Sequence, residues 1–126
     1  MLVALALAIA APIAEPVLAP RIARACARRP VPRNPCADLR PIFEHSSNYP
    51  AEARRRGESG VVYYRVNVAV TGRVTSCEIT RTSGSQSLDE GTCAIFRDRM
   101  IYDPARDSSG RPVPGVDTGH ETWVRP

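Results

Sequence analysis

The sequence contains no lysine, and all seventeen basic side chains among its 126 residues are arginines. Together with the abundance of alanine and proline, this absence is most simply explained by a bias toward GC-rich codons, so the arginine count is no sign of selected guanidinium groups. Residues 20–47 hold six arginines and two acids, whereas residues 48–126 hold eleven arginines and ten acids. Because this larger part is nearly neutral, the sequence argues against nucleic acid as a partner.

Histidine is also scarce, with only His45 and His120, and no two of the four cysteines are spaced as C-x-x-C. Zinc sites are usually built from such residues in clusters, so we expect no metal. No serine or cysteine is placed to form an obvious nucleophilic pair with a histidine, and no glycine-rich phosphate loop is present. We therefore expect that the protein is not an enzyme and binds no cofactor.

The first apolar run, residues 1–14, is short for a membrane-spanning helix, which needs about 20 apolar residues. The small-residue spacing of Val-Leu-Ala at 17–19 is typical of a signal-peptidase site, although no basic region precedes the run. We expect residues 1–19 to form a cleaved signal peptide. A short membrane anchor is the alternative, and Pro12 and Pro16 disfavour a buried helix.

Residues 20–47 combine many prolines and arginines with no sustained apolar period. Such a composition predicts a semi-extended linker. Four cysteines in a small exported chain suggest disulfides, and Cys26 and Cys36 could close a small loop in this linker. The other interpretation is that these two cysteines are flexible and only incidentally paired.

Alternating valines and tyrosines within residues 60–84 predict a β-hairpin. Thr71-Gly72 would form a two-residue turn between the two strands. The core-facing positions of the first strand are Val62, Tyr64, Val66, Val68 and Val70. The cross-strand pairs set by that turn are Val68 with Thr75, Val66 with Cys77, and Tyr64 with Ile79.

Two helices are expected, one before and one after the hairpin in the sequence. The first covers residues 51–56, with Pro50 suited to its first turn and Gly57 as its stop. The second runs from about Ser87, a candidate N-cap, to about Met100. Its inward stripe consists of Leu88, Thr92, Ile95, Phe96 and Met100, with Cys93 at the edge of the stripe.

The placement of two cysteines predicts a disulfide. Cys77 faces the core side of its strand, and Cys93 lies on the helix that should cover that side. We therefore predict a Cys77–Cys93 bond. Since the two positions are 16 residues apart, the bond would contribute about 3 kcal/mol by the chain-entropy estimate, which matters for a domain this small.

After the second helix, Asp103 before Pro104 is more typical of a turn residue than of a catalytic base. Residues 116–124 can then return as a strand with Trp123 toward the core. The order of elements predicts an α+β domain over residues 48–126, a small antiparallel three-stranded sheet with two helices packed on one face. Such a sheet leaves an open edge, on which a partner strand can dock.

The sequence from residue 48 to about 124 resembles the C-terminal domain of TonB-family proteins. Each matching piece is weak alone, but their order and spacing make the likeness fairly specific. The matching residues are Tyr49-Pro50 with Ala53, Gly60-Val61, Gly72-Arg73-Val74, Ser83-Gly84, Leu88-Asp89, and the block of Arg99, Tyr102, Pro104-Ala105-Arg106, Gly110 and Pro112-Val113. The pair Cys77 and Cys93 looks like a variant that some members of the family have.

The resemblance implies a periplasmic domain that takes part in energy-coupled transmembrane transport by binding outer-membrane receptors. In TonB itself, an inner-membrane anchor works with a proton-driven motor complex, and a receptor's N-terminal box peptide adds as a strand to the sheet. Carried over to this chain, the partner-binding residues would be Tyr49, Pro50, Asp117, Thr118, Gly119, His120, Glu121, Thr122, Trp123 and Val124.

Two other interpretations stay open. The first is a soluble exported module that binds an extended peptide, or pairs strands in a homodimer, without energy coupling. The second, which has the least support, is a periplasmic enzyme.

Overall fold

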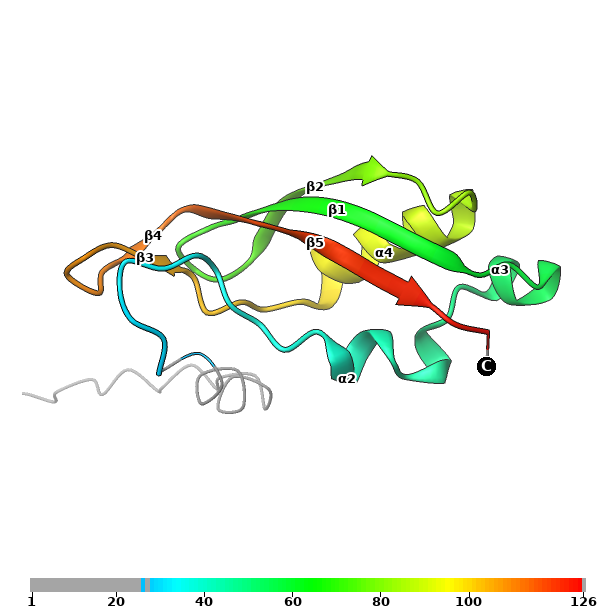
Figure 1. The fold of residues 1–126 in the computed structure, drawn as a ribbon, viewed down its shortest axis with the longest axis horizontal. Coiled ribbons are helices and arrows are strands. Elements are labelled where there is room, and N and C mark those ends of the chain that lie inside the picture. Colours follow the sequence, from blue (N-terminus) through cyan, green and yellow to red (C-terminus); the bar gives the residue numbers. More distant parts are fainter. Residues whose placement is uncertain (1–25, 27, 126) are drawn as a thin grey trace, which may run out of the picture.

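The computed structural model describes residue 26 and residues 28–125 (Figure 1). Residues 1–19, for which we expect a signal peptide or a membrane anchor, lie outside this part of the chain. Within the described residues, no helix has the length and apolarity needed to cross a membrane.

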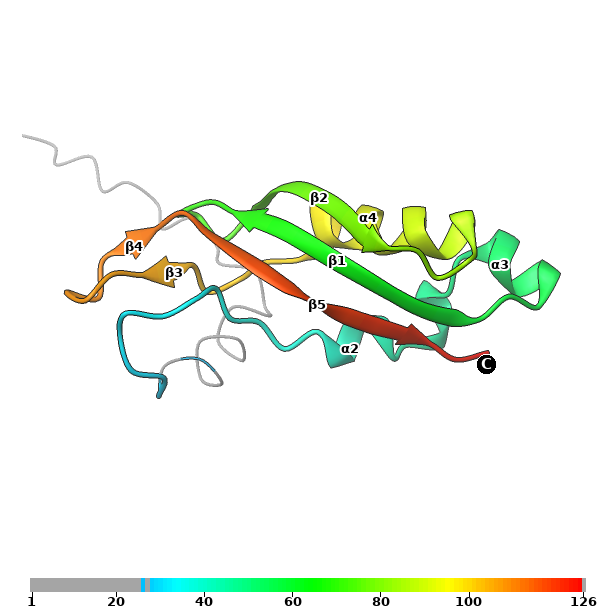
Figure 2. The same ribbon diagram turned by 45° about the horizontal axis from the view of Figure 1, so that its top comes forward.

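The described chain forms an antiparallel sheet with helices against one of its faces (Figures 1 and 2). The strands of the sheet are β1 (Gly60–Val68), β2 (Val74–Arg81) and β5 (Gly115–Trp123), in the order β2-β1-β5. A separate short ladder joins β3 (Ala105–Arg106) to β4 (Pro112–Val113). The helices are α2 (Arg40–Phe43), the 3₁₀ helix η1 (Ser46–Asn48), α3 (Ala51–Arg56) and α4 (Gln86–Arg99). The predicted α+β class, with a three-stranded antiparallel sheet, is confirmed.

The central strand β1 buries alternate residues, because successive side chains of a strand point to opposite faces. The buried residues are Val62, Tyr64, Val66 and Val68, and the intervening Tyr63, Arg65 and Asn67 are exposed. Four of the five predicted core positions are therefore confirmed. The fifth, Val70, lies beyond the strand and is 48% exposed.

The hairpin loop is longer than the two-residue turn that we expected. Two of the three predicted cross-strand pairs are present, Val66–Cys77 and Tyr64–Ile79. Val68, however, pairs with Val74 and not with Thr75. The cause is a distant contact: the Tyr102 N–H donates to the Gly72 carbonyl at 2.9 Å, and a Cβ at Gly72 would stand 2.1 Å from the Tyr102 carbonyl oxygen.

Helix α4 has Ser85 as its N-cap, and the expected N-cap, Ser87, lies inside the helix. The Ser85 hydroxyl oxygen accepts a hydrogen bond from the Leu88 N–H at 3.2 Å. The turn before the helix is fixed by Asp89, whose carboxylate accepts a hydrogen bond from the Ser83 N–H at 3.0 Å. The predicted inward stripe of α4 is buried at all five positions.

Residues 28–47 fold against the sheet and its helices, in contrast to the semi-extended linker that we expected. Phe43, at the end of α2, belongs to the hydrophobic core. Its ring centroid lies 5.4 Å from that of Phe96 and 5.5 Å from that of Trp123. Phe43 therefore anchors the end of this proline-rich segment in the core, although a single aromatic residue creates no periodic pattern in the sequence.

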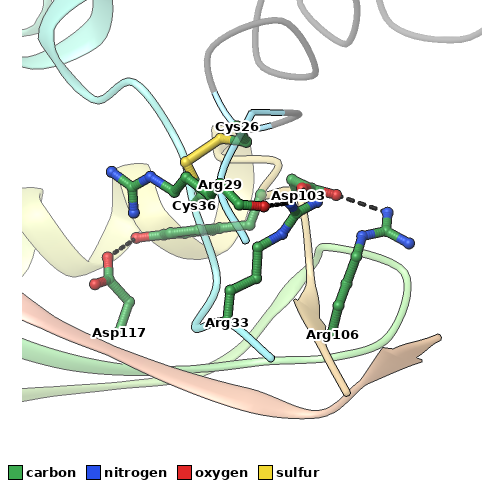
Figure 3. The surroundings of a disulfide bond; sticks show 8 residues. Cys26, Arg29, Arg33, Cys36, Asp103, Arg106 and Asp117 are labelled. Atoms are coloured by element: carbon green, nitrogen blue, oxygen red, sulfur yellow. Dashed lines mark hydrogen bonds and ion pairs between the residues drawn. A yellow bond between two sulfur atoms is a disulfide. The ribbon is translucent and has the colours of Figure 1, made fainter. Parts of the chain in front are cut away.

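The first part of this segment is held to the corner after α4 (Figure 3). The Cys26–Cys36 disulfide is formed, and Cys36 exchanges two backbone hydrogen bonds with Asp103, at 3.0 and 2.9 Å. The Asp103 carboxylate also accepts hydrogen bonds from the guanidinium groups of Arg33, at 2.9 Å, and Arg106, at 2.8 Å. Asp103 therefore acts as the point that joins the two segments.

The predicted Cys77–Cys93 disulfide is also formed. It links the middle of β2 to α4, the helix that covers the sheet. The first disulfide closes a loop within residues 26–36, and the second holds β2 against α4, as expected for a domain with a small core.

Candidate functional site

The last strand, β5, lies at one edge of the sheet. All nine of its residues pair with β1 in an unbroken antiparallel register, from Gly60–Trp123 to Val68–Gly115. Within the described part of the chain, no other strand or isolated bridge pairs with β5. We call this side of β5 the outer edge. The expected strand at 116–124 thus exists, although it begins and ends one residue earlier, at Gly115 and Trp123.

The segment containing α2 runs near β5, at that edge of the sheet (Figures 1 and 2). It meets the end of the strand through side chains, above all through the rings of Phe43 and Trp123. Among the residues that the structure describes, no backbone hydrogen bond joins this segment to β5. The outer N–H and C=O groups of β5 therefore have no main-chain partner in this part of the chain.

The side chains of β5 divide between the two faces of the sheet. Thr118, His120 and Thr122 are exposed on the face away from the helices. Asp117, Gly119, Glu121 and Trp123 lie on the side of the helices, where they are half-buried or buried. The eight predicted partner-binding residues from Asp117 to Val124 therefore form two different surfaces, and Val124, 73% exposed, follows the strand.

Trp123 anchors the end of β5 in the core and is 2% exposed. Its indole N–H donates to the Thr92 hydroxyl oxygen at 2.9 Å, and that hydroxyl donates to the Leu88 carbonyl at 2.7 Å. Its ring also makes edge-on contacts with Phe43 and Tyr49, at centroid distances of 5.5 and 5.4 Å. The end of the edge strand is therefore fixed to α4 and to the segment before the sheet.

A pocket of about 210 Å³ lies beside this end of the strand. The residues that line it are Phe43, Glu44, His45, Ser46, Tyr49, Thr122, Trp123 and Val124. Four of these are predicted site residues, which come from opposite ends of the domain. The first four were missed, because the composition of residues 20–47 predicted a linker and gave no sign that the segment would reach β5.

Pro50 does not line this pocket. It packs against α4 at Gly91, where an added Cβ would stand 2.5 Å from the Pro50 Cγ. This close approach explains why a residue with low helix propensity occupies the middle of α4. Of the two residues in the Tyr49-Pro50 motif, Tyr49 lines the pocket, and Pro50, at the start of α3, packs against α4.

Two carboxylates lie on the helix side of β5. The Tyr102 hydroxyl donates to Asp117 at 2.7 Å (Figure 3). Burial raises the pKa of Asp117, although this hydrogen bond and the charge of Arg29 act in the opposite direction. Burial also raises the pKa of Glu121, to about 7, and the negative charges of Glu44 and Asp117 add to the effect.

Between these two carboxylates stands Gly119. A Cβ at this position would lie 2.8 Å from the Tyr64 hydroxyl oxygen, so the glycine leaves room for the buried tyrosine of the neighbouring strand. Within the described residues, no group of three or more His, Cys, Asp or Glu side chains could hold a metal ion.

Comparison with known proteins identifies the family. Residues 45–116 match the family described as "Gram-negative bacterial TonB protein C-terminal". The chain belongs to this family. The family resemblance inferred from the sequence motifs is thereby confirmed.

The chain is also similar to Protein tonB2 of Pseudomonas aeruginosa, with 30% identity over 90 residues. The aligned region covers 71% of this chain and 30% of that protein, so the likeness concerns less than a third of the relative. No solved structure matches the chain. Most of β5 lies beyond residue 116, where the match to the TonB C-terminal family ends.

Proposed function

We propose that this TonB C-terminal domain binds the extended N-terminal segment of an outer-membrane receptor, which adds as a fourth strand to the outer edge of β5. The observation that carries the proposal is the unbroken nine-residue ladder of β5, which has no second backbone partner among the described residues. Strand addition uses such an edge, with main-chain hydrogen bonds for affinity and pockets for specificity.

The length of β5 suits this mode of binding. Nine residues at about 3.3 Å each give an edge of roughly 30 Å. Since a hydrogen bond contributes only about 0.5–1.5 kcal/mol net, several must form together. A nine-residue edge without register shifts allows this, because every second residue of the docked strand can bond to β5.

The role in transport comes from membership in the TonB C-terminal family. We propose that receptor binding takes place in the periplasm and serves energy-coupled transport across the outer membrane. Coupling to a proton-driven motor in the inner membrane would further require a membrane anchor, for which residues 1–19 are a candidate. If those residues are removed as a signal peptide, the same edge would serve an exported peptide-binding module without energy coupling.

Hydrogen–deuterium exchange of the domain tests the docking edge. The probes are synthetic peptides that copy the N-terminal segments of TonB-dependent receptors. We expect a bound peptide to slow exchange of the β5 amides and to leave β2 unchanged. Protection of β2 instead, or no protection by any peptide of the panel, would falsify docking at β5.

Two N-methylated versions of the best peptide form a matched pair. Each carries a methyl group on every second amide, one version on odd and the other on even positions. Strand addition uses the amides of only one edge of the peptide, so one version should lose binding and the other should keep it. Equal binding of the two versions would contradict main-chain pairing.

A further inference from the structure

The helix side of β5 offers two neighbouring features to a docked strand. One is the pocket beside Trp123, and the other is the carboxylate of Glu121. The two residues are two positions apart in β5 and therefore point to the same side of the sheet. A docked strand would meet both features with side chains that are likewise two positions apart.

We infer that the strand docked on β5 carries a bulky apolar side chain in the pocket beside Trp123 and, two residues away, a basic side chain next to Glu121. This inference rests on the proposed function, because it assigns the chemistry of the segment that adds to the outer edge.

The lining of the pocket explains the apolar side chain. The rings of Phe43 and Tyr49 each contact the Trp123 ring edge-on, and all three line the pocket. The volume of about 210 Å³ is large enough for a leucine-sized group. Burial of such a side chain should increase affinity roughly 10- to 100-fold over alanine.

Glu121 explains the basic side chain, and the contrast with Asp117 is decisive. Asp117 receives a hydrogen bond from Tyr102 and has Arg29 as a positive neighbour. Within the described residues, Glu121 accepts no hydrogen bond from another side chain and forms no ion pair. The charges that act on it, from Glu44 and Asp117, are both negative.

A half-buried carboxylate with only negative neighbours favours a cation beside it, since an opposite charge within about 4–6 Å stabilises the ionised form. Glu44 also lines the pocket, so acidic groups flank the position where the docked strand would pass. An arginine or lysine on the docked strand is the partner with matching charge.

A second copy of β5 does not supply these side chains. Its residues on the helix side are Gly115, Asp117, Gly119, Glu121 and Trp123, none of which is basic. An antiparallel pair of two β5 strands centred on Gly119 would place Asp117 opposite Glu121 of the other copy. Like charges directly opposite each other destabilise strand pairing, so the charge pattern favours a different chain over a homodimer.

Binding of synthetic octapeptides to the full protein tests the inference. The host peptide alternates threonine and valine, and its central residues are Arg-Thr-Leu or Leu-Thr-Arg. The two orders correspond to parallel and antiparallel docking, so one of them should bind better. In that peptide, we expect a 10- to 100-fold loss on replacing leucine by alanine. Replacing arginine by citrulline, which has a similar shape but no charge, should weaken binding about two- to fivefold, since a partly exposed ion pair contributes no more than about 1 kcal/mol.

Variants of the protein, combined with the arginine and citrulline peptides, complete a double-mutant cycle. In the Glu121→Gln variant, arginine and citrulline peptides should bind equally. The matched control is Glu78→Gln, which removes an exposed carboxylate from β2, the other edge strand, and should preserve the difference. A peptide with leucine and arginine in adjacent positions should bind more weakly, because the two side chains then point to opposite faces. Circular dichroism checks that both variants are folded.

The outcomes separate the inference from the proposed function. If the host peptides protect β5 from exchange but the leucine and arginine replacements do not change affinity, the inference is wrong and strand docking stands. If no peptide, including the receptor segments, protects β5, both fail. A concentration-dependent dimer that protects β5 in sedimentation and exchange experiments would also overturn the inference, because a second copy would then be the occupant.

Discussion

The two outer strands of the sheet, β2 and β5, differ in regularity. The pairing of β2 with β1 contains two register shifts, next to Tyr64 and next to Val68, and a disulfide ties β2 to α4. The pairing of β5 with β1 has no shift over nine residues, and β5 ends at a buried tryptophan beside a pocket.

Under the proposed function, this difference means that one edge of the sheet is protected and the other accepts a partner strand. Irregular pairing twists an edge and makes it a poor template for another chain, whereas a long regular edge accepts one. On β5 the inward-facing carboxylates provide a different protection, because they disfavour pairing with a second copy. The predictions below test this division, from the largest expected effect to the smallest.

The anchor of β5 should be the most sensitive point. Trp123→Ala removes a buried ring and its hydrogen bond to Thr92, and we expect the free energy of unfolding to fall by about 3–5 kcal/mol. Urea denaturation measures this loss, with the smaller change Trp123→Phe as the comparison. A loss below about 1 kcal/mol would mean that the end of β5 is not held by this side chain.

Removal of the β2 disulfide should have the next largest effect. The double variant Cys77→Ala and Cys93→Ala should lose about 3 kcal/mol of stability. Hydrogen exchange should become faster in β2 than in β5, because the bond holds β2 directly to α4 and does not involve β5. Equal acceleration in both strands would show that the two edges are not independent.

The hydrogen bond between Trp123 and α4 should contribute less. Thr92→Val keeps the shape of the side chain but leaves the buried indole N–H without its acceptor, and we expect a loss of about 1–3 kcal/mol. Thr80→Val, at an exposed position of β2, is the control and should change stability by less than about 0.5 kcal/mol. If the two variants lose the same stability, the bond to Thr92 does not anchor β5.

The pH dependence of stability should show the smallest effect. The pKa of Glu121 is raised from 4.5 to about 7 in the folded protein. Between these two values the folded state holds more protons than the unfolded state, so the contribution of Glu121 to stability falls as the pH rises. Stability at pH 8 relative to pH 5 should therefore be higher in Glu121→Gln than in the unchanged protein. An identical pH profile for the two proteins would contradict the raised pKa.

The regular elements of the fold followed from local patterns. The alternation that includes Val62 and Val66 identified the core face of β1, and the helical period identified the buried face of α4. Cys77 and Cys93 could be paired from these two faces alone. Each inference depended on a repeat within a few residues, which sequence displays directly.

The errors occurred where one segment meets another. Ser85 and Ser87 are both possible N-caps by residue type. In the structure Ser85 caps the helix, and Asp89 accepts a hydrogen bond from Ser83 in the turn just before it. The hairpin loop depends on Tyr102, thirty residues after Gly72. Neither contact leaves a periodic trace in the sequence.

By itself, the sequence determined the α+β class, the core faces of β1 and α4, the Cys77–Cys93 bond and the family. Only the tertiary structure decided that residues 28–47 belong to the folded domain and that Phe43 and Glu44 lie beside the end of β5. The physical reason is range: periodic patterns record which side of an element is buried, whereas the meeting of two distant segments depends on how all the elements pack together.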